Sequence, residues 1–542
     1  MTNFFFKSVC RIFQESDRVL CRLDRKTLKI DDRFITKFRY ILSNLRKGMS
    51  NSEARESLLF TPPHEVRGLT KLTRAAFAKS VKIPGLKVPK KEIARSQKIW
   101  KPLVLKLAAL KPIAELSDRD PLKESHSLIL LDPRKLKDLS TQQIEMLEGL
   151  GLNMEKPDQF EVELGYENWS VADVMRAVLP CEMDNVTSYT QVGHIAHLNL
   201  KPETLPFKNL IGEVILDKVP SVKTVVNKLN TIDNTYRNFS MELLAGEDNF
   251  VTQTKEHNCL FELDFSKVYW NSRLATEHQR IVDLIPKESV VYDVFAGVGP
   301  FAIPLAKKKH CIVFANDLNP ASYTSLQKNI TLNNIKQGCV NAWNLDGREF
   351  ILTVMKKNLE ERLEQLLDVQ KKRNRTNSSE SNTGNSDQSN LPFENTKNDK
   401  YQADVLRCSY VIMNLPAIAV EFLSSLRSFL HDTAFAACME TEPHLVRSLM
   451  PQVYCYAFSP KEDINTELKK CVEESLGCPV PDDYSTRLVR NVAPNKEMIC
   501  ISFKIWPELV LSSPNHRTVY KDRKRECGQD EACNKRQRLM TD

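Results

Sequence analysis

Residues 290–301 constrain the fold of this chain more than any other stretch, because they join an apolar run to a glycine-spaced turn. The apolar run has the length of a buried strand and ends at Asp293, and Gly297 and Gly299 follow it. Glycine permits a tight turn and lets a ligand approach the backbone closely. Pro300 stands where a proline begins a helix without losing a needed N–H. The stretch therefore predicts a strand, a turn and a helix whose N-terminal amides help to hold a cofactor.

The turn excludes two common cofactor motifs. No Gly-Lys-Ser/Thr follows it, so it is not a P-loop, and the three-glycine spacing of the dinucleotide fingerprint is absent. The next apolar run, residues 311–316, ends at Asp317, about 20 residues after the first glycine, where doubly wound folds place a ribose-binding carboxylate. Asp317 alone is also compatible with a simple helix cap. Together, Asp293, the turn and Asp317 favour a nucleoside-bearing cofactor, and S-adenosylmethionine suits the site better than a dinucleotide.

Length and composition set wide limits on the rest of the chain. The 542 residues are enough for two or three domains, and no apolar run approaches the length of a membrane span. A net charge of +8 permits an anionic partner but does not require one. The 14 cysteines are scattered without paired metal spacing, so they indicate reduced thiols and neither a disulfide framework nor a metal site.

The chain divides by composition into five segments. The first is basic and aromatic and resembles a mitochondrial presequence, although a disordered or accessory N-terminus fits it equally. The last is polar and basic, which suits a nuclear signal or a solvated end. The expected segments are an N-terminal extension (1–55), an N-terminal recognition domain (56–175), an α+β middle domain (176–285), an α/β domain (286–507) and a disordered tail (508–542).

Alternation of strand and helix patterns in the fourth segment predicts a parallel sheet. Residues 373–400 are almost without apolar side chains, so they are expected to form a disordered insertion. Residues 350–372 are expected to form a charged amphipathic helix. The expected strands are 127–131, 192–200, 214–217, 261–265, 340–345 and 410–413, with an antiparallel hairpin of 486–492 and 498–505 closing the sheet.

Four motifs together resemble the eukaryotic and archaeal tRNA (guanine-N1)-methyltransferases that act on position 37, beside the anticodon. They are residues 192–200, 269–277, 293–301 and 414–416. The likeness covers roughly residues 59–507 without the 373–400 insertion. It implies a class I (Rossmann-like) S-adenosylmethionine methyltransferase domain preceded by α+β tRNA-binding domains, working as a monomer on folded tRNA. We expect such a protein in the mitochondrial matrix, the cytoplasm and the nucleus.

The chemistry of this reaction calls for a base and a cation. Guanine N1 carries a proton and a delocalised lone pair, so a carboxylate that removes the proton during attack makes it a nucleophile. Negative charge then develops on O6, where a cationic donor stabilises it. By the resemblance, Glu277 is the base and Arg237 stabilises O6. Without the resemblance, a helix-surface salt bridge from Glu277 to Arg273 or Arg280 is the simpler interpretation.

The resemblance also assigns binding roles. Asn414 would read the base edge and hold the substrate-facing end of the cofactor, while Pro416 stiffens the turn, although loop chemistry alone also explains both. Tyr269 would stack on an extruded guanine, with core packing as the rival interpretation. The expected cofactor-binding residues are His278, Asp317, Leu318, Asp346, Gly347, Asn414, Asp293 and Gly297.

Two other functions compete with methyl transfer. The related enzyme that transfers the aminocarboxypropyl arm of S-adenosylmethionine in wybutosine synthesis has a Gly-Asn step where this chain has Ser272-Arg273. It also has a longer Gly/Pro/Ser loop where this chain has residues 414–416. Both differences favour methyl transfer. A catalytically dead RNA-binding scaffold is disfavoured because the acid, amide and cofactor carboxylates are all present.

Overall fold

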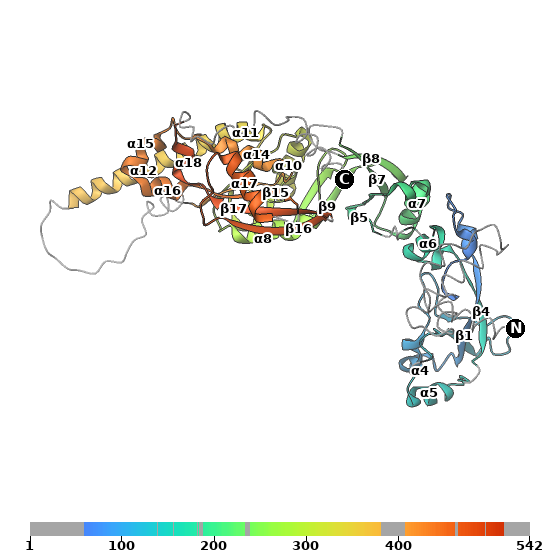
Figure 1. The fold of residues 1–542 in the computed structure, drawn as a ribbon. Coiled ribbons are helices and arrows are strands. Elements are labelled where there is room, and N and C mark those ends of the chain that lie inside the picture. The colour runs from blue at the N-terminus through green and yellow to red at the C-terminus, as the bar shows by residue number, and fades with distance from the viewer. Residues whose placement is uncertain are drawn as a thin grey trace, which may run out of the picture. The chain divides into compact units, whose positions relative to one another are not determined.

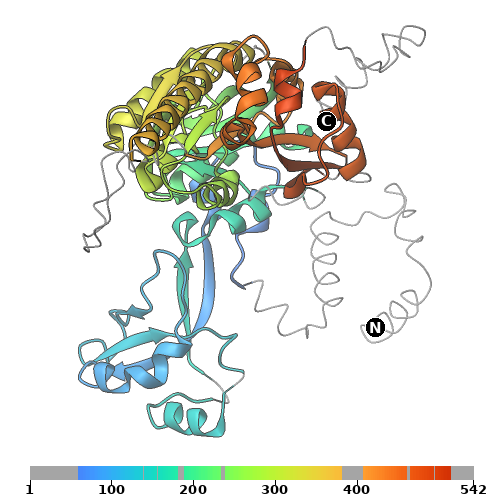
Figure 2. The ribbon, with the colours of Figure 1, turned by 90° about the vertical axis from the view of Figure 1, so that its left-hand side faces the viewer.

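The computed structural model describes residues 59–513, except 138, 155–156, 181–182, 184–187, 233–238, 381–406, 461–463 and 494. The chain forms two compact units, Met1–Thr187 and Ser188–Asp542, so the first division falls after the expected boundary at 175/176. Figures 1 and 2 show both units. Within the described part, no helix combines the length and apolar character needed to cross a membrane.

The first unit is built on an antiparallel sheet of order β2-β3-β1-β4. One side of this sheet packs against Trp100, Leu147 and their apolar neighbours to form a small core. The strand expected at 127–131 is confirmed as β3. The elements are η2 (His64–Val66), η3 (Arg74–Phe77), β1 (Lys79–Pro89), α4 (Ile93–Trp100), η4 (Lys101–Leu103), β2 (Ile113–Ala114), β3 (His126–Leu130), α5 (Thr141–Glu148), β4 (Gln159–Leu164), η5 (Tyr166–Asn168) and α6 (Val171–Val178).

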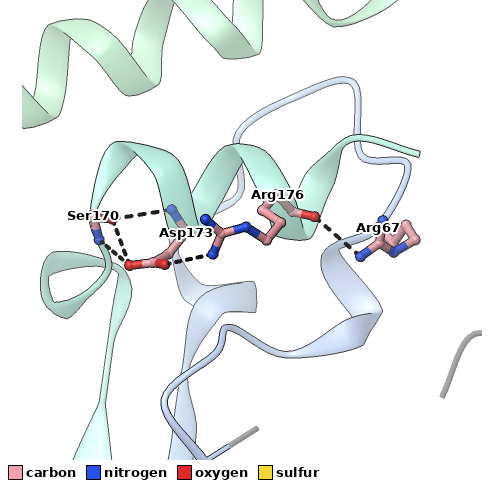
Figure 3. Close-up of polar contacts among 4 residues, drawn as sticks. All are labelled: Arg67, Ser170, Asp173 and Arg176. Atoms are coloured by element: carbon pink, nitrogen blue, oxygen red, sulfur yellow. Dashed lines mark hydrogen bonds and ion pairs between the residues drawn. The ribbon is translucent and has the colours of Figure 1, made fainter. Parts of the chain in front are cut away.

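Helix α6 is fixed at both ends within the first unit (Figure 3). At its N-terminus, the Ser170 hydroxyl accepts the Asp173 N–H and the Asp173 carboxylate accepts from Ser170, which is a capping box. Near its C-terminus, Arg67 Nη2 donates to the Arg176 carbonyl at 3.2 Å. Because the last carbonyls of a helix lack intrahelical partners, this contact explains why α6 stays with the first unit.

The second unit begins with a four-stranded sheet of order β5-β6-β7-β8. The single strand expected at 192–200 is wrong, because the chain turns at Gly193 and His194 between β5 and β6. Gly193 has φ +55°, a conformation that breaks an extended strand. The first elements of this unit are β5 (Thr190–Val192), β6 (Ile195–Leu198), η6 (Pro202–Phe207), α7 (Lys208–Lys218), β7 (Thr224–Ile232), β8 (Phe239–Gly246), β9 (Val251–Glu256) and β10 (Cys259–Asp264).

Helix α7 overturns the strand expected at 214–217. Its buried residues Leu210, Ile211, Val214 and Ile215 recur at helical spacing, so they form one apolar face. That face covers the sheet, where a side chain on Gly212 would collide with Leu244. Burial against the sheet therefore outweighs the preference of the β-branched residues for a strand.

The main sheet of the second unit has seven strands in the order β13-β12-β11-β14-β15-β17-β16. Strands β13 to β15 are parallel to one another, and β17 and β16 form the antiparallel hairpin expected at the end of the domain. The α/β class I architecture is confirmed. The remaining elements are η7 (Ser272–Leu274), α8 (Ala275–Leu284), β11 (Val290–Asp293), α9 (Ala302–Lys309), β12 (Ile312–Asn316), α10 (Pro320–Leu332), β13 (Val340–Trp343), α11 (Gly347–Phe350), a π-helical turn (Ile351–Met355), α12 (Lys356–Glu380), β14 (Ser409–Met413), α14 (Ala419–Phe422), η9 (Leu423–Leu426), α15 (Ala434–Thr441), α16 (Pro443–Leu449), β15 (Gln452–Ser459), α17 (Ile464–Leu476), β16 (Ser485–Ala493), β17 (Lys496–Lys504) and α18 (Pro507–Leu511).

Helices cover both faces of this sheet. Val411 and Met413 of β14 join the core formed with α12, α14 and α17, while Ile412 between them joins the core formed with α8 and α9. This alternation is what a buried central strand produces.

The structure moves two segment boundaries expected from the sequence, the start of the insertion and the end of the α/β domain. Helix α12 runs through 373–380, inside the segment expected to be disordered, since its Lys- and Arg-rich sequence contains no Gly or Pro to end the helix. Helix α18 extends past the expected end of the domain at 507, and its Leu509 and Val510 are buried in the core. Residues 1–58, 381–406 and 514–542 lie outside the described residues, so the expectations for the N-terminal extension, the rest of the insertion and most of the tail stay predictions.

Candidate active site

The carboxyl ends of β11, β12, β13 and β14 meet along one side of the main sheet, which we call the carboxyl edge. The strand register pairs Asp293, the last residue of β11, with Ala315 of β12 and Ile412 of β14. The residues that follow these strands therefore come together. Ligands of open α/β sheets bind outside this edge.

Asp317 closes the glycine turn. Gly297 N–H donates to Asp317 Oδ2 at 2.8 Å, and Asn319 N–H donates to Asp317 Oδ1 at 2.9 Å. Gly297 and Gly299 both have positive φ, +55° and +96°. A side chain on Gly299 would meet Ile303, whereas the space beside Gly297 is open. The helix cap considered for Asp317 is supplied by Asn319, whose side chain accepts from Ala321 N–H.

Asp293 carries a buried carboxyl group. It is fully buried, and neither oxygen forms a hydrogen bond of full geometry with a described residue, although the Phe295 N–H lies close enough to lower its pKa. Burial raises the pKa of Asp293 well above its usual value, and the nearby Asp317 charge raises it further. Burial also raises the pKa of Asp317. Two such carboxyl groups beside an open glycine turn fit a ligand that carries positive charge and hydrogen-bond donors.

Leu318, Asp346 and Gly347 lie around the same turn. Asn344 Nδ2 donates to the Leu318 carbonyl at 2.9 Å, and the Leu318 side chain is exposed. Asp346 caps α11 through the Arg348 N–H at 2.7 Å. A side chain on Gly347 would lie 2.9 Å from the Phe295 ring, so glycine is needed for this close packing.

His278 is a buried residue of α8 that contacts Glu256 and Phe301. Its Nδ1–H donates to Glu256 Oε1 at 2.6 Å, and its ring meets the Phe301 ring edge-on at 4.8 Å. With 4% of its surface exposed, His278 supports the turn through Phe301. The His278 side chain packs between α8 and β9, and its contact with the cofactor stays a prediction.

Glu277 is buried in a polar network rather than in a surface salt bridge. Arg280 donates to it twice, from Nε to Oε2 at 2.7 Å and from Nη2 to Oε1 at 2.5 Å. The Tyr456 hydroxyl donates to Oε1 at 2.7 Å. Of the two arginines considered from the sequence, the structure pairs Glu277 with Arg280 and not with Arg273.

Tyr456 connects this network to the carboxyl edge. Met413 of β14 pairs with Cys455 of β15, so Tyr456 stands level with Asn414. Asn414 Oδ1 is buried without a hydrogen-bond partner, and the Pro416 carbonyl accepts the Phe458 N–H at 3.0 Å. The Glu277 network and the Asn414 turn therefore lie on neighbouring parts of the same edge.

Tyr269 is an exposed aromatic residue on the segment that precedes α8. It is 54% exposed, which favours stacking over the core packing considered above. In the same unit, Lys228 Nζ lies 5.5 Å from the Phe265 ring, and the His197 ring lies 5.1 Å from the Phe265 ring. Burial lowers the pKa of His197 to about 4, and the charges of Lys228 and Arg273 contribute. This surface suits an anionic ligand.

The sequence analysis did not identify Asn316 and Tyr456, and the expected Arg237 is outside the described residues. Arg237 lies between β7 and β8, outside the described residues. Asn316, which ties three strands together by donating to the Val294 and Leu345 carbonyls, has no motif to reveal it. Tyr456 could have been found only by following the alternation of β15 to the side that faces α8. Within the described part, no group of three or more His, Cys, Asp or Glu side chains is placed to hold a metal ion.

Comparison with known proteins identifies relatives over most of the chain. A family model described as the TRM5/TYW2 methyltransferase domain matches residues 252–363, and one described as the TYW2 N-terminal domain matches residues 171–249. The tRNA (guanine(37)-N(1))-methyltransferase of Xenopus tropicalis is 42% identical over 459 residues, 84% of this chain and 82% of that protein. The Homo sapiens protein of the same name is 41% identical over 465 residues, 85% of this chain and 81% of its own.

One solved structure illustrates how far this likeness extends. The crystal structure of wild-type Trm5b from Pyrococcus abyssi is 23% identical, covers 78% of this chain and 99% of its own, and has a TM-score of 0.45. The curated relatives, and not this structure, establish the family.

Proposed function

The chain belongs to the family of the tRNA (guanine(37)-N(1))-methyltransferases, and from this premise we propose that it transfers the methyl group of S-adenosylmethionine to N1 of guanosine 37 of tRNA. In the structure, the observation that carries the proposal is the shared carboxyl edge. It joins the open turn of Gly297, Asp293 and Asp317 to the Glu277 carboxylate through Asn414 and Tyr456.

S-adenosylmethionine, when bound, supplies a methyl group on a positively charged sulfur. The buried Asp293 carboxylate suits the positive charge of this molecule, and Asp317 retains acceptor capacity for ribose hydroxyls. Leu318, Asp346 and Gly347 line the same turn.

Glu277 removes the guanine N1 proton as N1 attacks, which is the step that makes this nitrogen nucleophilic. Arg237 stabilises the charge that develops on O6. The partnerless Asn414 amide oxygen accepts from the base edge, and Pro416 keeps this turn rigid. The exposed Tyr269 stacks on the guanine.

The cationic surface supports tRNA as the substrate. Burial lowers the pKa of Lys228, and the charge of Arg273 lowers it further, so an approaching phosphate stabilises this pair of cations. The exposed Tyr269 offers a ring for a base. These cations and this aromatic ring support the binding of a nucleic acid.

Aminocarboxypropyl transfer is the second function to be tested, because the matching family model is described for both groups of enzymes. S-adenosylmethionine labelled in the methyl group, and separately in the aminocarboxypropyl carbons, would be supplied with tRNA that carries guanosine or adenosine at position 37. We expect only methyl label in tRNA, recovered as 1-methylguanosine, and no label with adenosine. Transfer of the aminocarboxypropyl label would overturn the proposal.

We also propose that the protein acts as a monomer and is distributed among the mitochondrial matrix, cytoplasm and nucleus. The basic, aromatic residues 1–55 and the basic clusters of residues 521–538 support the distribution. Light scattering of the full chain and imaging of variants lacking either segment would test these two points.

A further inference from the structure

The Glu277 carboxylate is held by two neighbours from different parts of the fold. Arg280 comes from the next turn of α8, and Tyr456 comes from β15, 179 residues away in the sequence. Glu277 is 7% exposed and Tyr456 is fully buried. An arginine fork and a buried tyrosine hydroxyl together restrict the position of a carboxylate far more than either contact alone.

The two oxygens of Glu277 are used unequally. Oε1 accepts from both Arg280 Nη2 and the Tyr456 hydroxyl, which occupies its two lone-pair directions. Among the described residues, Oε2 accepts from Arg280 Nε alone. One acceptor direction therefore remains on the carboxylate, and it belongs to Oε2.

We propose that Arg280 and Tyr456 are positioning residues that hold the Glu277 carboxylate and direct its Oε2 to the guanine N1 proton. This inference rests on the proposed function, since it assumes that Glu277 is the base. Neither residue touches the guanine. Both act through the carboxylate that they hold.

The proton and electron balance follows from this arrangement. The N1–H bond of guanine breaks and an Oε2–H bond forms on Glu277. The electron pair left on N1 forms the new bond to the methyl carbon, and the pair of the broken carbon–sulfur bond stays on sulfur. Neutral Glu277 then leaves Arg280 as an uncompensated cation, which favours return of the proton to water before the next turnover.

The other groups around the carboxylate stay neutral. Tyr456 of β15 and Cys500 of β17 lie beside the carboxylate, and burial raises the pKa of Tyr456 and raises that of Cys500 to about 12. Tyr454, two residues before Tyr456, stacks on the Tyr410 ring instead, and burial raises its pKa as well. Burial lowers the pKa of Arg280, but its bonds to Glu277 outweigh this, and the net pKa is raised. Near neutral pH, Arg280 is thus the cation that balances Glu277.

An ion pair that only stabilises the fold would show the same contacts in the free protein. The test must therefore separate a role in folding from a role in positioning Glu277 for the reaction. Tyr456→Phe removes one hydroxyl and keeps the buried ring. Its effect on the single-turnover methylation rate would be measured in the wild-type chain and in Glu277→Gln. Tyr454→Phe, on the same strand and face but without a hydrogen bond to Glu277, is the matched control.

In the wild-type background we expect Tyr456→Phe to slow the reaction by roughly 10-fold or more, the scale of one hydrogen bond to a charged group. Affinities for S-adenosylmethionine and tRNA should stay within about 2-fold. The pH at which the rate is half-maximal should rise, because the ionised carboxylate loses a donor. In the Glu277→Gln background the same substitution should have little effect, and Tyr454→Phe should have little effect in either.

Equal slowing by Tyr456→Phe in both backgrounds would overturn the inference, because the hydroxyl would then act independently of Glu277. An unchanged rate and pH profile would overturn it as well. If Tyr456→Phe fails to fold, Arg280→Lys replaces it. That variant keeps the positive charge but loses the pair of guanidinium donors that hold both carboxylate oxygens. It should also slow methylation only when Glu277 is present.

Failure of the wider proposal gives a different result. If wild-type protein yields 1-methylguanosine and Glu277→Gln reacts at the same rate, the base and its positioning residues are both wrong, while methyl transfer stands. If wild-type protein yields no 1-methylguanosine, the proposed function itself is wrong.

Discussion

The carboxyl edge has two halves that are built in different ways. The cofactor half consists of Asp293 at the end of β11 and of the residues that follow β11, β12 and β13, including Gly297 and Asp317. The acceptor half consists of Glu277 with Arg280, Asn414 and Tyr456. In the cofactor half, side chains bind nearby backbone, as in the 2.8 Å bond from Gly297 N–H to Asp317. In the acceptor half, the hydroxyl that binds Glu277 is 179 residues away. A local motif therefore specifies the first half, whereas only the completed fold assembles the second.

The two halves also differ in whether their carboxyl groups are paired with a cation. Burial raises the pKa values of Asp293 and Asp317, and within the described part of the chain no cationic side chain is paired with either, so a positively charged ligand would complete the cofactor half. Glu277 is already paired with Arg280. We therefore expect substitutions in the cofactor half to change binding, and substitutions in the acceptor half to change the rate.

The largest effect should come from Glu277→Gln. Glutamine keeps the size of the side chain but cannot take up the guanine proton, so the single-turnover methylation rate should fall by roughly two to four orders of magnitude. Affinities for tRNA and S-adenosylmethionine should change little. If the variant binds poorly yet reacts at the wild-type rate once saturated, Glu277 is a binding residue. The acceptor half would then affect binding, as the cofactor half does, and not the rate.

In the cofactor half, Asp317→Ala should weaken S-adenosylmethionine binding by about 1–3 kcal/mol, because charged hydrogen bonds to the ribose and to the glycine turn are lost. Calorimetry on the folded variant measures this. Asp432→Ala, which removes an exposed carboxylate bonded to Lys356, is the matched control. Unchanged affinity for Asp317→Ala would take this residue out of the site.

Acidification should also weaken cofactor binding, by several-fold. The raised pKa values of Asp293 and Asp317 mean that these groups take up protons at a higher pH than ordinary aspartates. A cationic ligand prefers their ionised forms, so binding is fully favoured at high pH and lost as the pH falls. Calorimetry between pH 8 and pH 5 on wild type and Asp317→Ala would check this, with a flatter dependence in the variant. Equal slopes would assign the effect to other groups.

The sequence predicts the strand, turn and helix of the cofactor half because their determinants are contiguous. The run of residues 290–301 alone indicates the strand, the turn and the ligand edge. It cannot indicate the Glu277 network, because nothing near Tyr456 in the sequence marks it as a partner of α8. The same limitation explains α7, where a β-branched run became helical because a sheet covers it.

His197 of β6 should make stability depend on pH. Its folded pKa is about 4, below the ordinary 6.5, because it is buried beside Lys228 and Arg273. Between these values the unfolded chain binds more protons, so stability is complete above pH 6.5 and is lost as the pH falls toward 4. The loss should be on the order of 2 kcal/mol. Chemical unfolding of wild type and His197→Gln at several pH values tests this, and parallel curves for the two proteins would contradict it.

The smallest effect should come from removing residues 381–400, which tests whether anything outside the two halves contributes to them. This segment is rich in Asn, Ser and Thr and has few apolar residues to bury, so replacing it with a short Gly/Ser bridge should leave thermal stability and methylation nearly unchanged. Leu363→Ala is the contrasting variant, because Leu363 of α12 is fully buried and its truncation should cost about 2–5 kcal/mol. If the deletion instead slowed single-turnover methylation while stability held, these residues would contact the tRNA. The acceptor half would then extend beyond the carboxyl edge.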